Sequence, residues 1–587
     1  MRLSPLLLAL ASTAVAAQTS QDENVHEYIV VGSGPGGGPL AARLAQAGHS
    51  VLLIDAGEDQ FNNTNSRIVY NNTLAINDPL TRWDFFVNRD EEEFEREYEF
   101  TTWRRPDGEF YVGLDPPEGS ERLGVYYPRA ATLGGCAMHN AATILLPADV
   151  DWNDISEITG DDSWTAANMR KHFVSLERCN YLENGSDPSH GFTGWLDTSQ
   201  GDASWSLNNS DLTSLAQLTS NLLGGNETAF TLFELLSRDQ NANDPERDQE
   251  VGVITPHTHS RHGVRSSPLD LIRSTLGDPR NFPLVVQQHT LVTKVLFSDR
   301  SSKKNTPRSI GVEYLQGKSL YSADPRYDPD TNGTLGRAYA TKEVILAGGV
   351  FNTPQILKLS GIGLRSELEY FGIPVVKDLP GVGTRMKDNY DAVLYGTFAN
   401  PVEGWYDIWY KTAAALRTRD IHFYCGRMNF MGFFPGMPGW NPNEFECGFM
   451  QLHPRNINGT VRLRSKDPRE VPDIHLGFFK NGNDEDLESI LEAINFVRPI
   501  FHSLGNNTFT EHRPCAAGVE CTDDWQRHYL RAQVYSHHAT GTCALGADDD
   551  PLAVLQMLDL RLSSRRFGAR PLFDVQKQPR RSPVLLP

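Results

Sequence analysis

A glycine-rich turn near the start of the chain has the spacing needed to hold the phosphates of a dinucleotide. Its glycines, Gly32, Gly34 and Gly37, follow the pattern G-x-G-x-x-G. The first makes a tight turn, the second lets the backbone approach a pyrophosphate, and the third lets a helix pack against a strand. Asp55, about twenty residues further on, is placed to accept hydrogen bonds from ribose hydroxyls. The predicted binding residues are Gly32, Ser33, Gly34, Gly37, Asp55 and Ala56.

The segments around this turn have the order expected of a nucleotide-binding unit. Residues 27–31 predict a buried parallel strand, residues 39–48 an Ala/Leu-rich helix that ends at a glycine, and residues 50–54 a second strand. The N-terminus of that helix offers unpaired N–H groups to phosphates. The complete order favours a nucleotide site over a glycine loop without a ligand, but it does not separate FAD from NAD.

Three later segments resemble the glucose–methanol–choline (GMC) family of FAD-dependent oxidoreductases. Residues 128–140 contain a Gly-Gly-Cys-x-x-His-Asn loop. Residues 343–363 contain a strand that runs into a glycine turn, followed by a second signature-like stretch, and residues 535–546 contain a His-x-x-Gly-Thr sequence. The resemblance extends over residues 25–555. It implies FAD as the cofactor.

The resemblance also implies which residues contact that cofactor. The backbone of Gly134 and Gly135 is expected to pass under the flavin, where side chains would clash. His139 is expected beside the flavin, either joined to it covalently or not, with Asn140 next to it in the loop. The backbone of Val292, in a predicted strand over residues 289–297, is expected to contact the adenine side.

Catalysis in this family implies a histidine near the flavin. His538 aligns with it and is expected to take the hydroxyl proton of an alcohol as hydride leaves carbon, because the pKa of histidine lies near neutral. His537 is expected to be structural, and a one-residue slip in the alignment would exchange the two roles. A second histidine or asparagine, which the family places further on, is not visible in residues 556–587.

The implied fold is α/β, with a Rossmann-like FAD-binding domain and an interleaved α+β substrate-binding domain. The predicted boundaries are a signal peptide at 1–17, FAD-binding segments at 24–155, 263–390 and 511–555, substrate-binding segments at 156–262 and 391–510, and an atypical tail at 556–587.

The N-terminus predicts entry into the secretory pathway, leading to the extracellular space, cell wall or vacuole. Arg2 precedes the apolar run 6–10, and Ala14-Val15-Ala16 is a small-residue cleavage site. The run is too short to span a membrane. Eight Asn-x-Ser/Thr sequons predict glycosylation. Of seven cysteines, Cys515 and Cys521 are placed to pair, and Cys136 is expected to be unpaired.

The net charge of −20 argues against nucleic acid or an anionic membrane as a partner, because both would be repelled. The tail reverses this sign with seven basic residues against Asp559 and Asp574. Two interpretations stay open: a basic arm with its own partner, or a shifted reading frame after about Leu555. The sequence does not indicate the oligomeric state.

Four functions compete. The leading one is oxidation of an alcohol or lactol of a small molecule by hydride transfer to FAD, with O2 or another electron acceptor. The loop 134–140 and the leader also resemble fungal members of the family in secondary metabolism, including mycotoxin biosynthesis, of a patulin synthase-like type. The alternatives are a non-redox cyclase or lyase, an NAD-dependent dehydrogenase, and an inactive flavin-binding protein, which the tail keeps open.

Overall fold

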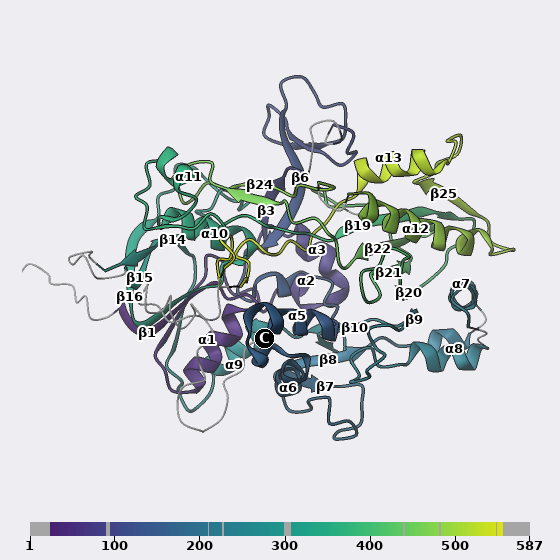
Figure 1. Cartoon of the computed structure of the whole chain (residues 1–587), viewed down its shortest axis with the longest axis horizontal. Helices are drawn as coiled ribbons and strands as arrows, with labels where there is room; N and C mark the ends of the chain where they lie inside the picture. The colour runs from purple at the N-terminus through teal and green to yellow at the C-terminus, as the bar shows by residue number, and fades with distance from the viewer. Residues whose placement is uncertain are drawn as a thin grey trace, which may run out of the picture.

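The computed structural model describes most of the chain, and Figure 1 shows its arrangement. The described residues are 24–89, 94, 96–208, 210–225, 228–298, 307–437, 441–480, 483–547 and 549–555. The predicted leader at 1–17 and the predicted tail at 556–587 lie outside them. Two large sheets organise these residues, and smaller sheets connect them.

The first large sheet is the predicted Rossmann-like sheet. Its strand order is β13-β2-β1-β16-β15-β14, and the four strands from β13 to β16 run parallel. The predicted strands 27–31 and 50–54 and the helix 39–48 are confirmed within a few residues. The bounds are β1 Val25–Val31, α1 Gly37–Gln46, β2 Val51–Ile54, β13 Leu284–Gln287, β14 Thr290–Phe297, β15 Ser309–Gln316 and β16 Thr334–Leu346.

Both faces of this sheet are covered, which explains why its central strands are apolar throughout. Val30 on β1 packs with the side chains of α1 and of α9 (Pro268–Leu276). Its neighbours Ile29 and Val31 point the other way, toward β14, β15 and α10 (Gly349–Leu359). The alternation follows from the two-residue period of a strand.

The second large sheet is antiparallel, with the order β25-β19-β22-β21-β20-β9. One face is apolar and packs against the long helix α12 (Asn483–His502), as Figure 1 shows. The other face is more polar, because it carries Asp391 on β19, Glu446 on β22 and His422 on β21. The bounds are β9 Gly252–Ile254, β19 Tyr390–Phe398, β20 Trp405–Tyr410, β21 Ile421–Gly426, β22 Glu444–Gln451 and β25 Phe509–Arg513.

Smaller sheets carry two segments that matter below. The sheet β3-β6-β4-β5 delivers the chain from the end of β6 into residues 131–140, and the sheet β10-β8-β7 lies below it in the view of Figure 1. Their strands are β3 Arg82–Val87, β4 Thr102–Arg104, β5 Phe110–Val112, β6 Glu121–Ala130, β7 Glu177–Cys179, β8 Leu196–Gln200 and β10 His257–Thr258.

The remaining elements are short or peripheral. The helices are α2 Thr64–Arg67, α3 Asn72–Asn77, α5 Asp149–Thr159, α6 Ala166–Leu176, α7 Asp211–Leu222, α8 Ala229–Leu236, α11 Arg365–Tyr370 and α13 Asp523–Gln533. The strands are β11 Ser260–Arg261, β12 Val264–Arg265, β17 Ile362–Gly363, β18 Lys377–Asp378, β23 Thr460–Arg462 and β24 Asp473–His475. None of the helices among the described residues is long and apolar enough to cross a membrane.

Two disulfides join described residues. The predicted pair Cys515–Cys521 is confirmed, and a second, Cys425–Cys447, links the neighbouring strands β21 and β22. Cys136 is free, as expected, together with Cys179 and Cys543.

Candidate active site

The turn after β1 is confirmed as a close backbone packing site. Gly32 has φ +96°, and a Cβ there would lie 2.2 Å from the carbonyl oxygen of Ala347. A Cβ at Gly37 would lie 2.0 Å from the carbonyl oxygen of Gly32. Both contacts are too short for any side chain, so the turn, α1 and the end of β16 require these glycines.

Asp55 holds this turn in place. Its Oδ2 accepts hydrogen bonds from the backbone N–H (2.8 Å) and the hydroxyl (2.5 Å) of Ser33, and its Oδ1 accepts one from the N–H of Gly57 (2.8 Å). Burial raises the pKa of the Asp55 carboxyl, while these donors lower it. Three accepted bonds leave capacity for one more, because a carboxylate has about four acceptor positions.

The loop 131–140 is brought against the first turn. The N–H of Gly134 donates to the hydroxyl oxygen of Ser33 at 3.0 Å, so Ser33 links both loops to Asp55. A Cβ on Gly135, where φ is +59°, would lie 2.6 Å from Cα of Gly34. The two glycine loops therefore touch backbone to backbone and form one cradle, which we call the glycine cradle (residues 32–37 and 134–135).

The other predicted binding residues surround this cradle. The N–H of Thr290 donates to the carbonyl of Asp55 at 3.0 Å, which places buried Val292, two residues along β14, beside the end of β2. Ala56 packs partly buried against the main core. Asn140 has a local role, because its carbonyl accepts a 2.7 Å bond from Arg265 and its amide oxygen contacts His259 at 3.2 Å.

His139 lies in the loop just after the cradle. Its side chain is 1% exposed, and neither ring nitrogen has a well-formed hydrogen bond among the described residues, although the ring interacts with the neighbouring Cys136 thiol. Its ring centroid is 6.4 Å from that of His537. A buried imidazole without well-formed hydrogen bonds is costly, so this position fits a group that the ring itself would contact.

A chain of three hydrogen bonds links the backbone of residues 538 and 539 to Asp388 and Tyr127. The N–H of His538 donates to Oδ1 of Asp388 (2.7 Å), and the hydroxyl of Tyr127 donates to Oδ2 of the same residue (2.7 Å). The N–H of Ala539 donates in turn to the Tyr127 oxygen (2.8 Å). Burial raises the pKa of the Asp388 carboxyl to about 6, and these donors oppose the shift.

The two adjacent histidines differ in their surroundings. Nε2 of His537 donates to the carbonyl of Pro128 at 2.6 Å, and its ring stacks on Phe433 at 4.1 Å. The side chain of His538 is 46% exposed, makes no hydrogen bond to the described residues, and has its Nδ1 3.8 Å from Oδ2 of Asp391. Desolvation, then the nearby Arg129 and His422, lower the pKa of His538 to about 4, which favours the neutral form of its ring.

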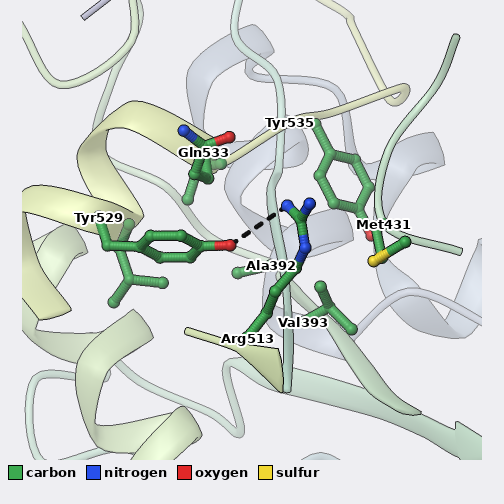
Figure 2. Close-up of a pocket in the computed structure, with 9 residues that line it drawn as sticks. Ala392, Val393, Met431, Arg513, Tyr529, Gln533 and Tyr535 are labelled. Carbon is green, nitrogen blue, oxygen red and sulfur yellow. Dashed lines mark hydrogen bonds between the residues drawn. The ribbon is translucent and has the colours of Figure 1, made fainter. Parts of the chain in front are cut away.

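A separate cavity lies between β19, β25 and α13, at one edge of the antiparallel sheet (Figure 2). Arg513, Tyr529, Gln533 and Tyr535 line it, and Arg513 donates to the Tyr529 hydroxyl at 3.3 Å. Its volume of about 10 Å³ holds roughly one water molecule. It is too small for a substrate.

Family models match two long parts of the chain. The N-terminal GMC oxidoreductase model matches residues 120–391 and the C-terminal model matches residues 454–563, and together they cover the loop 131–140, Asp388, Asp391 and the histidine segment. The chain belongs to the GMC oxidoreductase family. The second match extends beyond residue 555, into the segment that the sequence predicts to be atypical.

Known proteins similar to this GMC oxidoreductase agree with that assignment. Mitochondrial choline dehydrogenase of Mus musculus is 25% identical over 93% of this chain and 84% of that protein. Oxidoreductase cicC of Emericella nidulans is 27% identical over 65% of this chain and 56% of that protein. Pyridoxine 4-oxidase from Mesorbium loti has the same fold, with a TM-score of 0.65, 18% identity and coverage of 90% of this chain and 91% of that one.

Four residues of this GMC oxidoreductase that the sequence did not single out contact the predicted ones. They are Tyr127, Arg129, Asp388 and Asp391. Arg129 lies at the end of β6, close to Cys136. Desolvation would raise the pKa of the Cys136 thiol, but Arg129 and His139 bring it down to about 6. The sequence offered one clue to three of them, because Tyr127, Arg129 and Asp388 lie within or beside the family-like segments.

Proposed function

We propose that this GMC oxidoreductase binds FAD in the glycine cradle and oxidises a CH–OH group of a small molecule. The glycine cradle supports FAD, because its two loops meet at glycines where added Cβ atoms would overlap backbone. FAD is the cofactor typical of the family, and when bound it supplies the hydride acceptor. Ser33 and Asp55 hold the cradle, and the carboxylate's remaining acceptor capacity suits a ribose hydroxyl.

The main support for this function comes from the exposure and the contacts of the His538 ring. Its ring is accessible, makes no hydrogen bond to the described residues, and has its Nδ1 on the side of the Asp391 carboxyl. His538 takes the proton from the substrate hydroxyl. Asp388 fixes the backbone of His538, and Asp391 lies on the side of Nδ1, so the pair orients the imidazole toward the polar face of the antiparallel sheet.

His139 is proposed to hold the flavin covalently. Support comes from its burial and from the lack of a well-formed hydrogen bond at either ring nitrogen. Acid precipitation tests this: the wild-type pellet is expected to stay yellow, and His139→Ala is expected to release its flavin into the supernatant. Release of flavin from the wild type would leave His139 as a non-covalent neighbour.

The substrate is proposed to be an alcohol or lactol of fungal secondary metabolism, with O2 or another acceptor taking the electrons. Support for this setting comes from the 27% identity to oxidoreductase cicC of Emericella nidulans and from the loop Gly134 to Asn140, which resembles the patulin synthase-like type. Secretion and glycosylation are proposed from residues 1–17 and the sequons. The two disulfides fit an oxidising compartment.

Anaerobic flavin reduction tests the proposed activity. The purified yellow protein is mixed with a panel of small alcohols and lactols without oxygen, and its flavin absorbance is followed. Bleaching by at least one compound, with formation of the matching carbonyl product, is the expected result. Product formation without bleaching would show non-redox chemistry instead.

A further inference from the structure

A second group of reactive side chains lies on the three-stranded sheet β10-β8-β7. Glu177 and Cys179 are two residues apart on β7, so their side chains lie on the same face of the strand. His190 follows in a loop that returns to β7, where the N–H of Cys179 donates to the carbonyl of Gly191 at 2.8 Å. The three buried residues offer ligand atoms that all lie within 4.8 Å of one another.

The imidazole of His190 lies between two carboxylates. Its Nδ1 is 3.0 Å from Oε2 of Glu177, and its Nε2 is 2.9 Å from Oδ2 of Asp239. The side chains of His190 and Glu177 are fully buried. If Nε2 carries the proton toward Asp239, the lone pair of Nδ1 faces the Glu177 carboxylate. That contact is repulsive unless a proton or a metal cation lies between the two atoms.

A second buried histidine, His257, lies behind this group and faces Asp239. His257 is 0% exposed, and its Nδ1 has no hydrogen-bond partner among the described residues. Its Nε2 lies 3.3 Å from Oδ1 of Asp239, and the Tyr181 hydroxyl donates to the same oxygen at 3.1 Å. Asp239 is therefore shared by His190, His257 and the Tyr181 hydroxyl.

We propose that Glu177, Cys179 and His190 bind one zinc ion. A thiolate, an imidazole and a carboxylate are the ligands that zinc takes in proteins. Asp239 occupies the position of the carboxylate that orients a metal-bound histidine from behind. The hydroxyl of Thr198 (2.7 Å) and the N–H of Gly191 (2.9 Å) hold the Glu177 carboxylate in the same way.

Zinc binding at this site exchanges protons for the metal. The Cys179 thiol gives up its proton, and Nδ1 of His190 gives up any proton it carries, so both protons leave to solvent as the metal bonds form. Three protein ligands leave one tetrahedral position for a water oxygen or a further imidazole. The ion closes the loop 180–190 onto β7, so its role is structural and is independent of the proposed oxidation.

The test uses the untagged full-length flavoprotein. The protein is stripped with a chelator, reloaded with Zn²⁺ and gel-filtered, and its zinc is then measured by mass spectrometry and X-ray absorption. About one zinc per chain is expected, with one sulfur at about 2.3 Å and N/O ligands at about 2.0–2.2 Å. The thermal midpoint is expected to rise on reloading, because the ion binds only the folded chain.

Variants locate the site. Cys179→Ser and His190→Gln are expected to lose the zinc, and Asp239→Asn to weaken binding about 10–100-fold. The controls are Cys543→Ser, which removes another free thiol, and His453→Gln, which removes a surface histidine, and both are expected to keep the metal.

Two results would overturn the proposal. One is a wild-type protein that carries only background zinc and shows no change in its thermal midpoint, which would leave His190 as an imidazolium between two carboxylates. The other is full zinc content in both ligand variants. Where a variant does not fold, X-ray absorption of the reloaded wild type provides the test. Absence of a sulfur ligand at about 2.3 Å from the zinc would overturn the proposal.

Discussion

The backbone N–H of His538 donates a 2.7 Å hydrogen bond to the buried carboxylate of Asp388, a residue 150 positions earlier in the chain. The other carboxylate oxygen accepts from the Tyr127 hydroxyl, which accepts in turn from the N–H of Ala539. The backbone that carries the proposed base is therefore set by a side chain from the start of the antiparallel sheet. Displacing Asp388 would displace the base.

Removing the proposed base should abolish turnover while leaving the fold intact. His538→Gln is expected to lower kcat about 10²–10⁴-fold, the usual contribution of a positioned acid or base. Flavin content should not change, since the side chain makes no hydrogen bond to the described residues. His528→Gln, at an exposed ion pair with Glu97, is the matched control and should keep wild-type activity. Equal turnover in the two variants would remove His538 from catalysis.

The buried Asp388 carboxyl should make stability depend on pH in an identifiable window. Desolvation raises its folded pKa to about 6 from an ordinary 3.8, so the folded state binds its proton more tightly than the unfolded state does. The resulting stabilisation is fully present below about pH 3.8 and is lost as the pH rises through about 6. It amounts to roughly 3 kcal/mol.

Urea unfolding of Asp388→Asn measures that contribution. The free energy of unfolding of the wild type is expected to fall more steeply than that of the variant between pH 4 and about 6, because only the wild type releases the Asp388 proton when it unfolds there. Parallel curves for the two proteins would mean that Asp388 titrates near its ordinary value.

Removing the Ser33 hydroxyl should destabilise the protein more than removing an exposed serine hydroxyl. Its oxygen accepts from Gly134 and donates to Asp55, so Ser33→Ala leaves a buried N–H and a buried carboxylate short of a partner. A loss of about 1–3 kcal/mol in the free energy of unfolding is expected. Ser204→Ala, whose hydroxyl bonds an exposed Asp202, should change it by less than about 0.5 kcal/mol. A small effect at Ser33 would show that the loops are held by other contacts.

A methyl group at the crossing of the two loops should prevent flavin binding. Gly135→Ala places a Cβ 2.6 Å from Cα of Gly34, a contact that backbone atoms cannot relieve without moving. Gly48→Ala is the control, because Gly48 also has a positive φ but has nothing within 4 Å of its added Cβ. Flavin absorbance of the purified proteins is the measurement. Retention of flavin in Gly135→Ala would argue against the glycine cradle as the binding site.

Local patterns in the sequence predicted the local parts of this structure. The turn at Gly32, the helix after it and the pairing of Cys515 with Cys521 depend on residues close together in the chain. The disulfide Cys425–Cys447 depends on the register of β21 against β22, which no short pattern specifies. The roles of Asp388 and Asp391 beside His538 also depend on tertiary packing, since about 150 residues separate these segments.

The domain boundaries stay predictions, and so do the cofactor and catalytic roles of the named residues. The two large sheets agree with an FAD-binding and a substrate-binding part, but β9 and β25 join the antiparallel sheet from distant positions in the chain. Which distant segments belong to one sheet depends on how the strands pair. Hydrophobic periodicity identifies a strand but does not reveal its partner, so it does not fix the domain boundaries.

The pairing of β1 with β16 has a consequence for biosynthesis. Val31 lies opposite Leu346, so the apolar strand at the start of the chain is made long before its neighbour. At typical translation speeds the delay is about 15–60 s. During that interval one edge of β1 has no native partner, which makes this strand a natural client for a chaperone on the nascent chain.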